Sequence, residues 1–222
     1  GLYSLQDLAR LESNVAAIKV AVIVGGGLIG VELAEMLHSR KIETRIIARE
    51  SEYWNNVLPD EEAKMVGRVI REHGVSLDLS EELESIQGTE NDRVCGITLK
   101  SGRVVECQFV GLTAGVRPNI ELLRASEVET NRGILVDQSF HTTVKDIYAA
   151  GDCAEFIGKE KNIVEQLWYT GKMQGEAVGD VISGRHRIYD RGVWFNSAKF
   201  FDLEYQTYGR VPSAQEDAPR PH

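Results

Sequence analysis

The sequence predicts an α/β protein built around a parallel β-sheet, and two observations lead to that prediction. An apolar run at 20–24 breaks into a glycine-rich turn, and a helical pattern begins directly after it. Buried parallel strands are continuous apolar runs of this kind, because helices cover both faces of their sheet. Strand-like and helix-like segments then alternate along the first part of the chain, which is typical of βαβ units.

Each element in the first half of the chain has a local signal. Ser4 followed by Asp7 matches a helix cap, Pro59 with Asp60 matches a helix start, and Gly74 matches a helix end. The expected elements are, in order, a leading helix behind Ser4, a strand at 20–24, a helix with Ile29, Leu33 and Leu37 as its inward stripe, a strand at 44–48, a helix from Pro59 to Gly74 and a strand at 75–79.

The periodicity changes in the second half. From residue 84 to a buried strand at 109–112, apolar and polar residues alternate, with turn signals at 91–92 and 101–102, so we expect a β-meander. The pattern breaks at 116–119, because the residue before Pro118 is pushed out of the α region, and we place the main domain boundary there. The elements expected beyond it are a short helix at 120–123, strands at 134–136 and 147–150, and a helix at 164–182 that ends near Gly184.

The glycine turn carries the clearest chemical signal. Gly25, Gly27 and Gly30 have the spacing G-x-G-x-x-G between a strand and a helix. The first glycine permits a tight turn, the second lets the backbone approach a pyrophosphate, and the third lets the helix pack on the strand. The pattern therefore predicts a Rossmann-like domain that binds a dinucleotide at the helix N-terminus. A purely structural turn is the alternative, because such turns also occur in proteins that bind no nucleotide.

Composition argues against several classes of function. Lys and Arg number 25 against 34 Asp and Glu, and the net charge of −9 makes nucleic acid an unexpected partner. No apolar run approaches the roughly 20 residues that span a bilayer, so we expect no membrane contact and a cytoplasmic location. Cys95, Cys107 and Cys153 lack redox or metal-site spacing, so we expect each to be a buried or half-buried free thiol. Neither a metal site nor a catalytic residue is assigned.

The residues after the second strand bear on which nicotinamide nucleotide binds. An acidic residue there usually accepts a hydrogen bond from the adenosine ribose 2′-hydroxyl, whereas an arginine accommodates a 2′-phosphate. Ala48 occupies the expected acidic position, about 20 residues after Gly27. Arg49 favours NADP(H) if it contributes, Glu50 would repel a 2′-phosphate, and both also fit a solvated turn. The choice between NAD and NADP stays open.

The last part of the chain is rich in aromatic residues. Trp194, Phe195, Phe200 and Phe201 form an aromatic cluster that we expect to be exposed and to bring two copies together as a homodimer. The tail at 212–222 is too rich in proline and charge to form a core.

Four blocks in a fixed order give the chain a family resemblance. They are GGGLIGVE at 25–32, TAGVRPN at 113–119, GILVD at 133–137 and IYAAGDCA at 147–154. The chain resembles the pyridine nucleotide-disulfide oxidoreductase family of flavoproteins, nearest to its NADH oxidase, nitrite reductase large subunit and ferredoxin or rubredoxin reductase branches. The resemblance extends from residue 1 to about residue 184.

The resemblance implies a domain plan and a function. Residues 1–117 would be an NAD(P)-binding domain, 118–187 the second part of an FAD-binding domain, and 188–222 the start of a C-terminal interface domain with its tail. Hydride would pass from NAD(P)H to FAD and on to an electron acceptor that the sequence does not identify.

The resemblance also assigns binding residues. Those implied for NAD or NADP are Gly25, Gly27, Leu28, Ile29, Gly30, Glu32, Arg49, Ala114 and Gly115. For FAD they are Gly151 and Asp152, although Asp152 also fits a simple helix cap. The family's N-terminal G-x-G-x-x-G for FAD is missing from these 222 residues, so the FAD site is incomplete here and a piece of a longer protein, inactive alone, is expected. The alternative is a nucleotide-binding or partner-binding module without catalytic activity.

Overall fold

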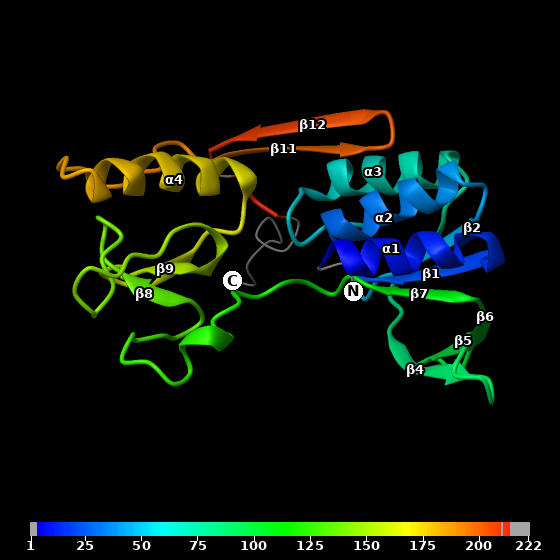
Figure 1. Ribbon diagram of the computed structural model, residues 1–222. Helices are drawn as coiled ribbons and strands as arrows, with labels where there is room; N and C mark the ends of the chain where they lie inside the picture. The colour runs from blue at the N-terminus through cyan, green and yellow to red at the C-terminus, as the bar shows by residue number, and fades with distance from the viewer. Residues whose placement is uncertain (1–3, 210, 214–222) are drawn as a thin grey trace. The chain divides into compact units, whose positions relative to one another are not determined.

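The computed structural model describes residues 4–209 and 211–213, and the chain divides into two compact units. Among the described residues, the first unit consists of 4–115, 197–209 and 211–213, and the second consists of 116–196. Figure 1 labels the elements of both units, each of which is described separately below.

The first unit contains a four-stranded parallel sheet in the order β3-β2-β1-β7. Its strands are β1 (Val20–Val24), β2 (Glu43–Ile47), β3 (Ser76–Asp78) and β7 (Phe109–Leu112). Ala21 pairs with Thr44 on one side and with Phe109 on the other, so β1 is an inner strand. A buried apolar strand at the centre of a parallel sheet is what the run at 20–24 predicts.

Helices and a second sheet cover the two faces of the parallel sheet. The helices are α1 (Leu5–Asn14), α2 (Leu28–Ser39) and α3 (Asp60–Glu72), with the short 3-10 turn η1 (Val15–Ala17) after α1. Figure 1 shows α2 and α3 on one side of the sheet and the meander strands on the other. Ala21 and Ile23 pack in the core with α2 and α3, whereas Val22 packs with Ile97 and Leu99 of the meander. The alternation follows from side chains pointing to opposite faces of a strand.

The leading helix and the meander confirm two expectations. Ser4 caps α1 reciprocally: its Oγ accepts from the Asp7 N–H at 3.2 Å, and its own N–H donates to Asp7 Oδ2 at 3.1 Å. The meander strands are β4 (Leu83–Gly88), β5 (Val94–Leu99) and β6 (Val104–Glu106), which form an antiparallel sheet. Its turns use left-handed backbone at Asp92 (φ 53°) and Gly102 (φ 84°), at the positions where the sequence signals turns.

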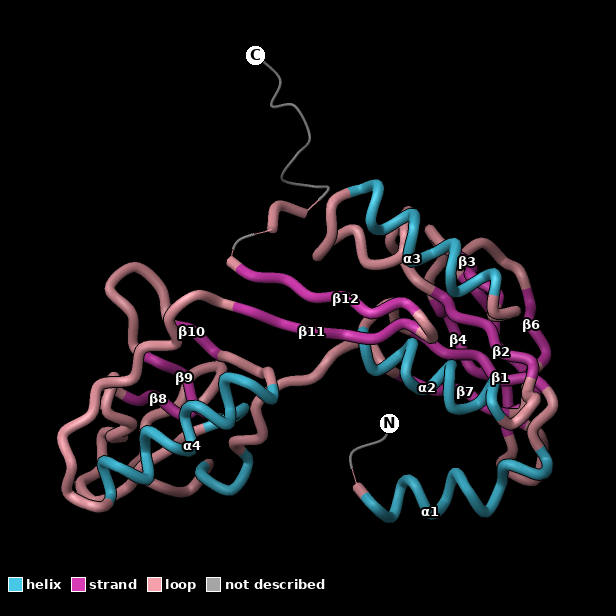
Figure 2. Tube along the Cα trace, turned by 90° about the horizontal axis from the view of Figure 1, so that it is seen from above, coloured by secondary structure: helices cyan, strands magenta, loops and turns pink. Residues whose placement is uncertain are grey.

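The aromatic segment corrects one expectation. It forms a hairpin of β11 (Phe195–Phe200) and β12 (Leu203–Tyr208), which runs beside α2 and α3 in Figure 2. Phe200 is fully buried and Phe201 is 6% exposed, so the expected exposed cluster is wrong for both residues. Trp54 lies 5.0 Å from Phe200 between ring centroids, and His73 stacks on Phe201 at 4.7 Å. The rings are buried because the first unit itself supplies the aromatic surface that they need.

The second unit has a small three-stranded sheet and one long helix. Its strands, in the order β10-β9-β8, are β8 (Ile134–Val136), β9 (Ala154–Phe156) and β10 (Ile163–Val164), with β8 and β9 parallel. The helix is α4 (Trp168–Ile182), and η2 (Glu121–Leu123) and η3 (Gly151–Cys153) are 3-10 turns. The helix begins four residues later than the sequence predicts because 163–164 pairs with β9.

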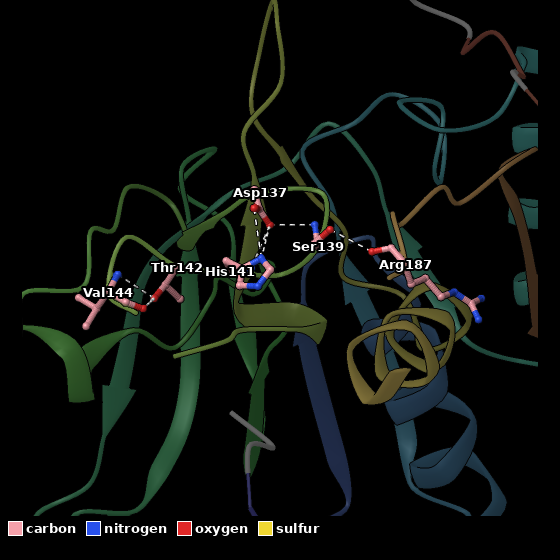
Figure 3. A network of polar contacts seen from close by, with 6 residues as sticks. All are labelled: Asp137, Ser139, His141, Thr142, Val144 and Arg187. Atoms are coloured by element: carbon pink, nitrogen blue, oxygen red, sulfur yellow. Dashed lines mark hydrogen bonds and ion pairs between the residues drawn. The ribbon is translucent and has the colours of Figure 1, made fainter. Parts of the chain in front are cut away.

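The strand expected at 147–150 does not form. That segment makes a single β-bridge, between Tyr148 and His141. Figure 3 shows the polar network that bends the facing segment, residues 137–141. Asp137 Oδ1 accepts from the N–H groups of Ser139 at 2.8 Å and His141 at 3.0 Å, which turns the chain around Phe140. Because Phe140 has a left-handed backbone (φ 67°), the segment facing 147–150 cannot continue as a ladder.

Candidate functional site

The glycine turn has the geometry that close packing demands at two of its three glycines. Gly25 has φ 125°, and a Cβ added to it would lie 2.5 Å from the carbonyl oxygen of Thr113. A Cβ added to Gly30 would lie 2.5 Å from the carbonyl oxygen of Gly25. Both distances are far below van der Waals contact, so only glycine lets the turn and α2 approach the strands this closely.

Gly27 differs from the other two glycines because it faces open space. It is the N-cap of α2, with φ −97°, and no side chain caps the helix. A Cβ added to Gly27 would meet nothing within 4 Å. The first backbone N–H groups of a helix lack partners within the helix, and its dipole is positive at this end. The open side of Gly27 therefore fits a pyrophosphate, which needs close backbone approach.

Tyr53 supports the turn from the protein side, and sequence reasoning missed it. Its Oη donates to the carbonyl oxygen of Gly27 at 2.9 Å, and its ring is buried. Burial, with the nearby Glu50 charge, raises the pKa of Tyr53 well above its ordinary value, so the phenol remains a donor. No signal in the sequence marks Tyr53, since it lies in an irregular loop after β2.

The other residues expected at the turn are partly as the sequence predicts. Leu33 and Leu37 are buried in the core, but Ile29 is 41% exposed and is not part of the inward stripe. Ile29 is the second residue of α2 and lies at the same end of the helix as Gly27, where an added Cβ would meet nothing within 4 Å. Leu28 is half-buried and Glu32 is exposed on α2.

The segment after β7 lies against the glycine turn. A Cβ added to Gly25 would lie 3.0 Å from the backbone nitrogen of Ala114, and Thr113 Oγ1 donates to the Val24 carbonyl oxygen at 3.1 Å. Gly115 is exposed and has φ 108°. The carboxyl ends of β1 and β7 thus bring the predicted glycines together with Ala114, at the edge where open α/β sheets bind ligands.

The end of β2 completes this edge of the sheet. Ala48 is 2% exposed and its Cβ would lie 3.2 Å from a Cβ added to Gly26. The Arg49 side chain is 77% exposed, and its Nε lies 3.2 Å from Glu50 Oε1. The Glu50 side chain is only 18% exposed, so the carboxylate side of this ion pair is mostly covered while the arginine side is open to solvent.

The second unit holds Gly151 and Asp152. Gly151 has φ 79°, a Cβ added to it would meet nothing within 4 Å, and its N–H donates to Gln174 Oε1 at 2.7 Å. Gln174 Nε2 in turn donates to Glu165 Oε2 at 3.1 Å, and Arg191 Nη1 donates to Glu165 Oε1 at 2.7 Å. Gln174 and Glu165 are buried, and this chain of hydrogen bonds holds the Gly151 turn. Asp152 is exposed inside η3 and is not its N-cap, so the simple cap does not account for it.

Other chemistry is not supported in the described part of the chain. Burial raises the pKa of the thiols of Cys107 and Cys153, which disfavours the reactive thiolate. Cys95 is exposed, so the expectation of burial is wrong for this residue. No group of three or more His, Cys, Asp or Glu side chains within residues 4–209 and 211–213 is arranged to hold a metal ion. No helix among those residues is long and apolar enough to cross a membrane.

Comparison with known proteins identifies the family. The sequence pattern of the pyridine nucleotide-disulphide oxidoreductases matches residues 2–175. The chain belongs to this family. The resemblance carried by the four sequence blocks is thereby confirmed, as is the Rossmann-like α/β fold class. Members of the family are FAD-dependent oxidoreductases that use NAD(P)H.

Individual relatives agree with this assignment. The chain is 32% identical over 158 residues to the nitric oxide reductase FlRd-NAD(+) reductase of Aliivibrio fischeri, covering 71% of this chain and 41% of the relative. It is 32% identical over 154 residues to the rubredoxin-NAD(+) reductase of Alcanivorax borkumensis, covering 69% and 40%. A solved NAD-dependent persulfide reductase from A. fulgidus has a TM-score of 0.87 and 26% identity, covering 97% of this chain and 40% of that one. The chain thus spans about two fifths of these proteins.

Proposed function

We propose that this chain is the nucleotide-binding core of an FAD-dependent reductase that passes hydride from NAD(P)H to flavin and on to an acceptor. The open side of Gly27 at the start of α2 supports this most directly, because it offers a place for a pyrophosphate in the middle of an otherwise tightly packed turn. Family membership supports both cofactors. The fold alone would not support this assignment, since one fold serves many functions.

The proposed contacts divide between the two units. The NAD(P)-binding residues we propose are Gly25, Gly27, Leu28, Ile29, Gly30, Glu32, Arg49, Ala114 and Gly115. The FAD-binding residues we propose are Gly151 and Asp152. When bound, the two cofactors supply the hydride donor and its acceptor, and the protein supplies binding and orientation.

The residues of this chain have physical roles in that reaction. The helix N-terminus at Gly27 neutralises part of the pyrophosphate charge, and Tyr53 holds the Gly27 carbonyl oxygen so that the turn keeps its shape. The buried Glu165–Gln174 pair holds the Gly151 N–H in place beside the exposed carboxylate of Asp152. Preorganisation of this kind reduces the entropy that binding must offset.

The acceptor, the oligomeric state and the location are further parts of the proposal. We propose a redox protein as acceptor, of the kind that the name rubredoxin-NAD(+) reductase gives for the relative. A homodimer would cover exposed apolar side chains of the second unit, such as Trp168 and Val193. The unpaired cysteines favour a reducing compartment, which the cytoplasm provides.

Substitution of Gly27 by valine tests the nucleotide site. The backbone at Gly27 suits any residue and an added Cβ meets no atom, so the variant should fold normally. Its side chain would nevertheless fill the space that a pyrophosphate needs. We expect affinity for NADH and NADPH, measured by titration calorimetry, to fall by about tenfold or more, since charged hydrogen bonds to the anion are lost.

Gly175→Ala is the matched control for this experiment. It also adds side-chain atoms at a helical glycine where a Cβ would meet nothing within 4 Å, but it lies in α4. We expect it to leave nucleotide affinity unchanged. Equal affinities of wild type and Gly27→Val, with normal circular dichroism for both, would contradict the proposed site.

A further inference from the structure

The end of β2 lacks the acceptor that an adenosine ribose needs, yet a carboxylate lies close by. Ala48 stands where β2 ends, and its methyl group is buried. Glu50, two residues later, turns back toward the glycine turn. A Cβ added to Gly26 would lie 3.6 Å from Glu50 Oε2 and 3.2 Å from the Cβ of Ala48. The carboxylate therefore occupies the space beside the small side chain at 48.

The backbone holds Glu50 in this place. The Glu81 N–H donates to the Ala48 carbonyl oxygen at 3.0 Å, and the Ser80 N–H donates to the Glu50 carbonyl oxygen at 2.9 Å. These two bonds fix both ends of the 48–50 segment to the chain that follows β3. With the main chain fixed and its side chain mostly covered, Glu50 has few other directions in which to place its carboxylate.

Arg49, the cation that a 2′-phosphate would need, already has an acidic partner. Its Nε is paired with Glu50 Oε1 at 3.2 Å. Lys100 chiefly, and Arg49 to a smaller extent, hold the pKa of Glu82 below its usual value, which places Arg49 near a second carboxylate. A 2′-phosphate entering here would meet the Glu50 charge as well as the guanidinium.

We infer that Glu50 replaces the missing acceptor at position 48 and makes this site select NADH over NADPH. The inference rests on the proposed nucleotide site and concerns its specificity. An ionised carboxylate only accepts hydrogen bonds, so it suits the ribose 2′-hydroxyl, which donates. It repels a 2′-phosphate, because the phosphate is also negatively charged at neutral pH and presents mainly acceptor oxygens.

Binding of the two nucleotides to the whole chain tests the inference without any need for activity. By calorimetry, wild type should bind NADH about tenfold more tightly than NADPH, the factor expected for one hydrogen bond to a charged group. Glu50→Gln keeps the shape and removes the charge, so the preference for NADH should fall by about tenfold. Glu50→Asp keeps the charge but shortens its reach, so it should weaken NADH while NADPH still binds poorly.

Glu52→Gln is the comparison variant. Glu52 lies in the same loop and its substitution changes the net charge equally, so the NADH preference should stay as in wild type. An NADPH preference in wild type, or an unchanged ratio in Glu50→Gln, would overturn the inference while leaving the nucleotide site intact. Failure of wild type to bind either nucleotide would instead refute the proposed function on which it rests.

Discussion

A single hydroxyl joins the loop after β2 to the glycine turn. Tyr53 Oη donates to the Gly27 carbonyl oxygen, which also accepts from the N–H groups of Gly30 and Val31 at the start of α2. The Gly27 carbonyl is therefore satisfied without the tyrosine, and the added bond serves to fix the loop against the turn. Because the pKa of Tyr53 is raised, the donor stays protonated throughout the ordinary working range of pH.

Tyr53→Phe should separate the effect of this hydrogen bond from the effect of packing the ring. The ring remains buried, so the free energy of unfolding of the first unit should fall by only about 0.5–1.5 kcal/mol, the net value of one hydrogen bond. Nucleotide affinity should fall a few-fold, because the turn is held less firmly. Urea unfolding and nucleotide titration measure the two effects, and no change in either would show that the bond is unimportant.

Individual residues differ in how far their roles could be predicted. The close packing at Gly25 and Gly30 was predictable from the spacing of the motif, because a strand that turns directly into a helix needs glycine at these positions. The position of Glu50 was harder to predict, since it depends on hydrogen bonds from Ser80 and Glu81, which are distant in the sequence. The local sequence pattern does not contain this information.

At the scale of elements, the hairpin β11–β12 shows how a strongly aromatic segment can be satisfied within its own unit. Phe200 contacts Trp54 and Tyr53, which lie in the loop between β2 and α3. Periodicity predicted most elements because helices and inner strands carry their own repeat. It failed for the hairpin's burial and for 147–150, where a tertiary contact or a turn network decides the outcome.

Phe200→Ala should destabilise the first unit strongly although residue 200 is far along the chain from its sheet. Removing a fully buried phenylalanine costs about 3–5 kcal/mol, because transfer energy and a cavity add together. Lys199→Ala, at the neighbouring exposed position of β11, should cost less than about 0.5 kcal/mol. Denaturant unfolding followed by tryptophan fluorescence compares the two, and equal small losses would show that the hairpin does not stabilise this unit.

At the scale of the whole molecule, the chain has two units with separate cores. One core contains Ile23, Leu37 and Phe200 in the first unit, and another contains Val136, Phe140 and Phe156 in the second. The α/β class and the family follow from motifs in the sequence. The assignment of 197–209 to the first unit could not be predicted from such motifs. It depends on the packing of Phe200 and Phe201, for which the sequence has no local signal.

A buried carboxylate gives the second unit its own response to pH. Glu155 on β9 accepts from the Gly133 N–H at 2.7 Å and from Asn131 Nδ2 at 2.9 Å. Burial by itself raises the pKa of Glu155, but these hydrogen bonds outweigh it and the net direction is down. A lowered pKa in the folded state stabilises the fold above the unfolded value, near 4.3, and this stabilisation is lost as pH falls toward the folded value.

The two units should therefore show separate unfolding transitions with different sensitivities. NADH should raise only the transition of the first unit, by mass action on the folded site, with a shift that grows with ligand concentration. Glu155→Gln should lower only the other transition at pH 7 and should flatten its dependence on pH between about 5 and 3, since Gln cannot titrate. Calorimetric scans of wild type and Glu155→Gln, each with and without NADH, measure the transition temperature of each unit. A single transition that responds to both the ligand and the substitution would show that the two cores unfold as one cooperative body, because each perturbation touches residues of one unit alone.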